Sequence, residues 1–433
     1  MSRRGVPARL LLACLLALAG TARADDWRTR ATLLGDPGGV RSALEHRGIE
    51  VEASTIVEAL GNPAGGRRQG FTAVTSNGID LALDLERLAG ARGLSFHLSG
   101  AWRTGQSLSG KYIGNVFTVQ QEFGNETIRL YALALEQSLW SDRLNVVAGR
   151  LGVGDDFATS PLVCLFVSNG ICGNPISIPL DDPSFTTYPV SSWGLRARGN
   201  PLPSWYAQAG VYEADAALAA NDTHGIAFAL PDAAGVLVLG EGGWKRPGTA
   251  PLGRVAVGLW WDSSDFDDLE ADTQGRPFAR TGRPARVHAG NRGLYAIAEH
   301  TLWQEPGGAA AEGIAAFTMA TFAPDDRNRV PFFWDAGIVW RGLVPGRADD
   351  VLVVGGMYGT FSDALADTQR IRRAQGRRLD PPQSWEAVVE LGYWIQVTGW
   401  LQIQPDLQYV ARPGGTGAIR NALALGAQVV VTY

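Results

Sequence analysis

The sequence has few charged side chains and, after its N-terminal segment, no long hydrophobic run. Charged residues make up 19% of the 433 residues, below the roughly 25% usual in globular proteins. A membrane helix needs about 20 apolar residues in succession, so the sequence beyond the N-terminal segment excludes such helices. The formal net charge of −5 gives no reason to expect nucleic acid binding.

Catalytic motifs are missing as well. There is no G-x-S-x-G, no H-E-x-x-H and no P-loop, and the five histidines lie far apart in sequence. We therefore expect no enzyme, no cofactor and no metal site. The acidic segment Asp262–Glu270 (DSSDFDDLE) resembles a calcium-friendly surface loop, although a solvated outer loop is the simpler interpretation. A secreted β-rich enzyme or glycan-binding protein is a remote alternative.

The N-terminal segment has the parts of a secretory signal peptide. Three arginines within the first nine residues are followed by an apolar run, Leu10–Leu18, and by Ala22-Arg23-Ala24, which has the A-x-A form of a cleavage site. We expect residues 1–24 to be a signal peptide. In the oxidising compartment beyond it, Cys164 and Cys172 could form a disulfide; two unbridged thiols are nearly as consistent with the sequence.

The remaining chain changes pattern once. Residues 25–48 predict a periplasmic segment with a short helix over Gly39–His46, ended by Gly48. From Ile49 to Tyr433 the hydrophobic pattern has period two, which predicts an all-β antiparallel barrel of about sixteen strands. Two of the expected strands are Arg254–Trp261 and Leu294–Leu302, with Asp262–Gly293 as an outer loop between them.

Alternation along the strands predicts a wall between lipid and a wet lumen. In Leu401–Tyr409 one face is apolar or aromatic, whereas the other reads Gln402, Gln404, Asp406 and Gln408. Connections also alternate between long ones, such as Gly152–Ser192, and short ones, such as Ser138–Arg143. Long outer loops and short periplasmic turns are typical of outer-membrane barrels.

Aromatic residues fall at the two expected interfaces, where ring systems with a polar tip are favoured. The periplasmic band is expected to contain Trp140, Trp205, Trp244, Trp303, Trp340, Trp400 and Tyr433. The outer band is expected to contain Trp102, Tyr212, Trp261, Tyr295, Trp334, Tyr358 and Tyr409.

One long connection is too apolar for an outer loop. Asp155–Ser192 contains PLVCLFVSNGICGNPISIPL, and a loop in water on all sides would not need Leu162, Val163, Leu165 and Phe166. We expect it to fold into the barrel as a constriction loop.

Several short motifs recur in the order and spacing of a known family. They are Leu34-Gly35-Asp36, Gly61-Asn62-Pro63, Arg129-Leu130-Tyr131, Glu136-Gln137-Ser138-Leu139, Tyr188-Pro189, Gly194-Leu195-Arg196, Gly293-Leu294-Tyr295, Asp326-Arg327-Asn328 and Gly342-Leu343-Val344-Pro345-Gly346-Arg347. In this the sequence resembles the carbohydrate-selective porins of the OprB type. The resemblance implies a sixteen-stranded outer-membrane barrel that takes up glucose and similar small sugars.

The same resemblance implies arginines, an acid and an aromatic near the narrowest point, the eyelet. Carried onto this chain, the candidates are Arg103, Arg129, Glu136, Asp155 and Trp193. Arginine and carboxylate groups offer donors and acceptors to hydroxyls, and an aromatic face covers a sugar ring. Ala132 stands where an acid is expected, so the eyelet is expected to be wider or less selective.

The expected partners follow from this interpretation. They are small sugars, outer-membrane lipid and the assembly machinery of the outer membrane, which would recognise the terminal aromatic Tyr433; a homotrimer is left open. The first alternative is a general or anion-preferring porin with an arginine-rich lumen.

Overall fold

The computed structural model describes residues 27–433 except 123–125, 229–234, 249–252, 307–311 and 379. The expected signal peptide, residues 1–24, lies outside the described residues. None of the described helices is long and apolar enough to cross a membrane.

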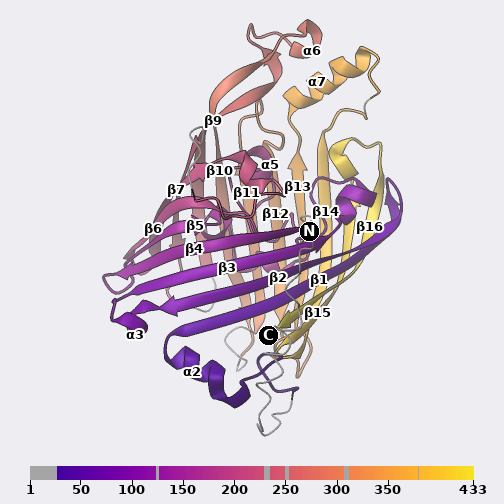
Figure 1. The fold of residues 1–433 in the computed structure, drawn as a ribbon. Coiled ribbons are helices and arrows are strands. Elements are labelled where there is room, and N and C mark those ends of the chain that lie inside the picture. The colour runs from indigo at the N-terminus through magenta and orange to yellow at the C-terminus, as the bar shows by residue number, and fades with distance from the viewer. Residues whose placement is uncertain (1–26, 123–125, 229–234, 249–252, 307–311, 379) are drawn as a thin grey trace, which may run out of the picture.

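Sixteen antiparallel strands close into one barrel, in which each strand pairs with its sequence neighbours and β1 pairs with β16. This confirms the predicted architecture (Figure 1). The strands are β1 (Ile49–Gly66), β2 (Gly70–Asp84), β3 (Leu94–Gly105), β4 (Thr127–Leu139), β5 (Leu144–Leu151), β6 (Ser192–Leu202), β7 (Trp205–Ala214), β8 (Gly235–Lys245), β9 (Gly253–Asp272), β10 (Ala285–Gln304), β11 (Gly313–Phe322), β12 (Phe332–Arg341), β13 (Val351–Thr360), β14 (Trp385–Thr398), β15 (Leu401–Ala411) and β16 (Arg420–Thr432).

Short helices mark the two ends of the barrel. Figure 1 shows α2 (Val40–His46) and α3 (Leu85–Ala89) at one end, and α6 (Phe278–Thr281) and α7 (Asp363–Ala374) at the other. The predicted N-terminal helix is confirmed, and Gly48 follows it with φ of 86°, a left-handed conformation that glycine adopts without a steric penalty. The first end is therefore the periplasmic one in the predicted topology.

The two faces of the wall are those that the alternation predicts. Leu425 is 52% exposed on the outside, whereas Gln404, Gln408 and Gln428 are buried in the interior. Two members of the predicted aromatic band differ: Tyr212 and Tyr295 are buried, and the hydroxyl of Tyr295 donates to Glu241. Both tyrosines fall on inward-facing positions of their strands, so they do not belong to the outer band.

The bounds predicted for the outer loop, Asp262–Gly293, are wrong. Strands β9 and β10 continue to Asp272 and from Ala285, so the connection is only residues 273–284. Figure 1 shows this hairpin rising above the barrel. Its outer part is mostly polar on both faces, so the apolar alternation that signals a membrane strand is lost there.

The β5–β6 loop (residues 152–191) folds into the barrel, as predicted for Asp155–Ser192. It contains α4 (Val153–Asp156), η3 (Val163–Leu165) and α5 (Ser177–Asp181). The backbone N–H of Val167 donates to Glu390 of β14 over 2.6 Å, and Gln404 of β15 donates to the carbonyl of Leu165 over 2.9 Å. These strands lie across the ring from β5 and β6, so the loop spans the lumen.

A second loop also folds inward, although the alternation of long outer and short periplasmic connections predicts Thr104–Thr127 to be an outer loop. The β3–β4 loop (residues 106–126) places Leu108, Ile113, Phe117 and Val119 in the interior. Its Gln121 N–H donates to the carbonyl of Val167 over 2.9 Å, and Asn169 donates back to Thr118. The two loops therefore pack against each other inside the barrel.

Candidate functional site

A cavity of about 620 Å³ lies between the two inward loops and the barrel wall. The wall residues come from β1, β2 and β3 on one side of the closure and from β14, β15 and β16 on the other. Ten of the 24 lining residues are polar but uncharged, and four are charged. Hydroxyls come from Ser54, Ser76, Thr159, Thr187 and Tyr188, and amides from Gln121, Asn169, Asn174, Gln402 and Gln428.

Arg103 is the first predicted site residue that lines this cavity. It leaves β3 toward the lumen, and its Nη2 lies 2.7 Å from Oε2 of Glu122 on the β3–β4 loop. Its guanidinium also lies 4.8 Å from the ring centre of Tyr188, and its Nε donates to Ser76. The arginine is thus held by a carboxylate, an aromatic face and a hydroxyl.

Asp155 is the second predicted residue at the cavity. It lies on α4 and accepts a hydrogen bond from the hydroxyl of Tyr131. Burial raises the pKa of Asp155 to about 6, although the Tyr131 hydrogen bond lowers it. The side chain of Asn174, which donates to the carbonyls of Gly154 and Phe157, fixes the turn that carries Asp155.

The other three predicted residues do not line the cavity. Arg129 donates to the carbonyls of Leu218 and Ala220, and so holds the β7–β8 loop. Glu136 pairs with His97 over 2.9 Å toward the periplasmic end of β4.

Trp193 lies on the outward face of β6. It alternates in step with Leu195, which is 49% exposed, and side chains two residues apart share a face of a strand. Its ring lies 5.8 Å from that of Phe228. The aromatic residues that the cavity does contain are Tyr188 and Trp394.

The charged lining residues are mostly acidic. Asp80, Glu122 and Asp155 carry carboxylates, and Arg103 is the one cationic side chain among the described lining residues. Because Arg103 is paired with Glu122, the remaining fixed charge is negative. Cys164 and Cys172 form a disulfide that also borders the cavity.

The apolar content that predicts the inward fold of the β5–β6 loop is also present, more weakly, beside Glu122. The segment VFTVQQE, residues 116–122, lies in a connection that the loop lengths predict to be an outer loop, yet it contains apolar residues, as the β5–β6 loop does. Tyr188 belongs to the Tyr188-Pro189 motif, so it was visible as a family feature without a role.

The profile of the family described as "Carbohydrate-selective porin, OprB family" matches residues 71–433. The chain belongs to this family. A relative, Porin B of Pseudomonas aeruginosa, is 29% identical over 421 residues, covering 93% of this chain and 91% of that protein.

The fold agrees with that membership. The high-pH structure of Pseudomonas putida OprB has a TM-score of 0.89 to this porin and is 26% identical, covering 94% of this chain and 100% of that one. The porin is therefore an outer-membrane barrel.

Proposed function

We propose that this porin passes monosaccharides and small oligosaccharides by passive diffusion, with the 620 Å³ cavity as its selective constriction. The observation that carries this proposal is the composition of the lining. Uncharged hydroxyls and amides surround a space that also contains the faces of Tyr188 and Trp394. Such groups match a sugar, which has hydroxyls at its edge and C–H groups on its faces.

The charged groups at the constriction would hydrogen-bond the hydroxyls of the sugar. The guanidinium of Arg103 has several N–H donors in a fixed plane, and Glu122 and Tyr188 hold that plane in place. The carboxylates of Asp80 and Asp155 accept hydrogen bonds from sugar hydroxyls. Because the contacts are few and reversible, a sugar can leave the site without an energy source.

A second cavity supports a route from outside. It has a volume of about 500 Å³ and is lined by Arg67, Arg329 and Gln383 near the outer loops. Val116 of the β3–β4 loop and Leu180 of the β5–β6 loop border it as well. The two inward loops therefore contact both cavities, and we propose that sugar passes from the outer cavity to the inner one.

The charges at the inner cavity favour neutral sugars over the anion-preferring alternative. Three carboxylates and one paired arginine line it, so an anion meets a repulsive field where the lumen is narrow and poorly screened. The anion-preferring alternative requires an arginine-rich lumen. Among the described residues, Arg103 is the one arginine that lines this cavity.

Single-channel conductance of the purified barrel tests the proposal. Glucose added to the bath should reduce the ion current in a saturable way, because an occupied constriction excludes ions. Sorbitol at equal concentration and viscosity serves as the control, since it lacks the pyranose ring face. Equal, unsaturable reductions by both solutes would contradict a sugar site. In liposome swelling, neutral hexoses should enter faster than hexonates of similar size; the reverse order would favour the anion-preferring porin.

A further inference from the structure

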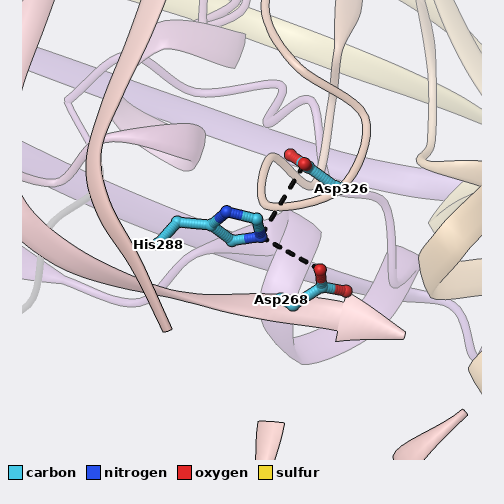
Figure 2. A group of neighbouring side chains, drawn as sticks. All are labelled: Asp268, His288 and Asp326. Atoms are coloured by element: carbon cyan, nitrogen blue, oxygen red, sulfur yellow. Dashed lines mark hydrogen bonds and ion pairs between the residues drawn. The ribbon is translucent and has the colours of Figure 1, made fainter. Parts of the chain in front are cut away.

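Three potential metal ligands from three different elements meet outside the lumen. They are Asp268 on β9, His288 on β10 and Asp326 on the β11–β12 loop (residues 323–331). One ligand atom of each lies within 4.8 Å of the others. Figure 2 shows both carboxylates directed at the same ring nitrogen of His288.

The two separations from His288 are close to those of ligands around one small cation. Nε2 of His288 lies 3.0 Å from Oδ2 of Asp268 and 3.7 Å from Oδ2 of Asp326. Ligands at about 2.1 Å from a metal ion stand roughly 3.0–3.4 Å apart in octahedral or tetrahedral geometry. The ligand oxygens of Asp268 and Asp326 lie within 4.8 Å of each other, so the partly exposed Asp326 side chain would have to close toward Asp268 to complete the site.

Hydrogen bonds from neighbouring groups orient the ligand side chains, as they do around known metal sites. Oδ1 of Asp268 accepts from the backbone N–H groups of Glu270 and Ala271, which leaves Oδ2 directed at His288. Asp326 forms a bidentate pair with Arg327, whose Nε lies 2.8 Å from Oδ1 and whose Nη2 donates to Oδ2 over 3.1 Å, which leaves Oδ2 one further lone pair for an ion. Asp268 and His288 are largely buried, whereas the side chain of Asp326 is 44% exposed, so water can complete the coordination from that side.

We propose that Asp268, His288 and Asp326 bind a divalent transition-metal ion at the outer end of the barrel. An imidazole with two carboxylates suits Zn²⁺, Ni²⁺ or Mn²⁺, whereas Ca²⁺ prefers oxygen ligands alone. The ion neutralises the two carboxylates and joins the β9–β10 hairpin to the β11–β12 loop. That junction already contains the Leu269 N–H donating to the Asp326 carbonyl over 2.7 Å and the Arg327 side chain donating to the Gly290 carbonyl. The side-chain amides of Asn291 and Asn328 also donate to each other across it.

Titration of the folded, detergent-solubilised barrel with Zn²⁺ tests the proposal. We expect one Zn²⁺ per chain, with Ca²⁺ bound far more weakly. Asp268→Asn and His288→Gln should each raise the zinc Kd by more than about 100-fold, since even indirect ligand contacts are worth about 10- to 100-fold. Asp267→Asn is the matched control, because it removes the same charge from the neighbouring, exposed position; its Kd should stay within about twofold. Heat-modifiable mobility verifies that each variant is folded.

The visible absorption of bound Co²⁺ gives a second measurement, because it depends on the ligands of the ion and not only on whether the barrel is folded. Its visible absorption should report nitrogen and oxygen ligands in the unmodified barrel and should change in His288→Gln but not in Asp267→Asn. The absence of saturable zinc binding, or an equal loss in Asp267→Asn and Asp268→Asn, would overturn the proposal. In that case the three residues form only an ion-paired cluster.

Discussion

Arg103 and Glu122 form an ion pair of 2.7 Å in which both side chains are less than a tenth exposed. Arg103 belongs to the barrel wall and Glu122 to the β3–β4 loop, so the pair joins the inward-folded loop to the wall. Its position at the cavity means that the same contact affects both the shape and the charge of the constriction.

Removing one member of this pair should change ion selectivity. Arg103→Ala leaves Glu122 as an unpaired buried carboxylate, which costs about 3–5 kcal/mol in comparable buried pairs and makes the lumen more cation-preferring. The double variant Arg103→Ala with Glu122→Gln removes both charges and should return selectivity toward that of the unmodified channel. Reversal potentials in a KCl gradient measure this. Identical potentials in all three proteins would show that ions do not pass this pair.

Replacing an aromatic residue at the cavity should affect sugar binding, whereas replacing one on the outer face should not. Tyr188→Ala should weaken glucose block by about 2- to 10-fold, since aromatic contacts of this kind contribute about 0.5–1.5 kcal/mol. Trp193→Ala is the control, because Trp193 lies on the outward face beside Phe228 and should leave the block unchanged. Sugar titrations of single channels give both values. A larger effect from Trp193 than from Tyr188 would restore the assignment made from the sequence.

The contrast between these two residues shows what the sequence could and could not predict. Period-two alternation is a local property, so the strands, the lumen-facing Gln402 and the lipid-facing Leu425 follow directly from it. The cavity depends on how the β3–β4 and β5–β6 loops pack against each other and against β14 and β15. Those contacts join residues far apart in sequence, and no local pattern encodes them.

All five candidate residues come from the family resemblance, and two of them line the cavity, each for its own reason. Arg103 ends a strand on an inward position, and Asp155 opens the loop that was identified as inward-folding by its apolar content. Arg129, Glu136 and Trp193 come from the same resemblance, which specifies neither the depth of a residue in the barrel nor the face of the strand on which it lies, and none of the three lines the cavity. Glu136 lies too near the periplasmic end, and Trp193 faces outward.

Asp155 should make selectivity depend on pH. Burial raises its pKa to about 6, so the carboxyl loses its proton between about pH 5 and pH 7 and adds a negative charge to the cavity. Cation preference should therefore rise over this interval, and Asp155→Asn should flatten the rise. The folded barrel holds this proton more tightly than the unfolded chain does, so Asp155 reduces stability as pH rises from about 4 to about 6. Reversal potentials at pH 5, 6 and 7 measure the selectivity. A pH dependence that persists in Asp155→Asn would assign it to another group.

A charge on the outer face of β16 should prevent insertion. Leu425→Arg places a guanidinium at a position that is 52% exposed on the lipid side, which costs about 2–4 kcal/mol near the bilayer midplane. Gln402→Arg is the matched control, since Gln402 lines the cavity and its side chain meets water. Folding yield into lipid vesicles, read as heat-modifiable barrel, should fall for Leu425→Arg only. Equal yields would mean that this part of β16 does not face lipid.

The last residue should affect assembly more than export. The backbone N–H of Tyr433 donates to the carbonyl of Ala53 over 2.9 Å, and its main-chain oxygen accepts from Nη2 of Arg41 over 2.7 Å. Tyr433 thus ties the N-terminal segment to the seam where β1 meets β16, and its ring ends the outward row of β16. Deleting it should lower the amount of heat-modifiable barrel in the outer membrane while the protein still reaches the periplasm. Tyr433→Phe keeps the ring and should assemble almost normally, whereas Arg41→Ala removes only the clamp on the main chain and measures that contribution by itself. If the deletion matched Arg41→Ala, the ring would have no part in assembly and the clamp alone would account for the loss.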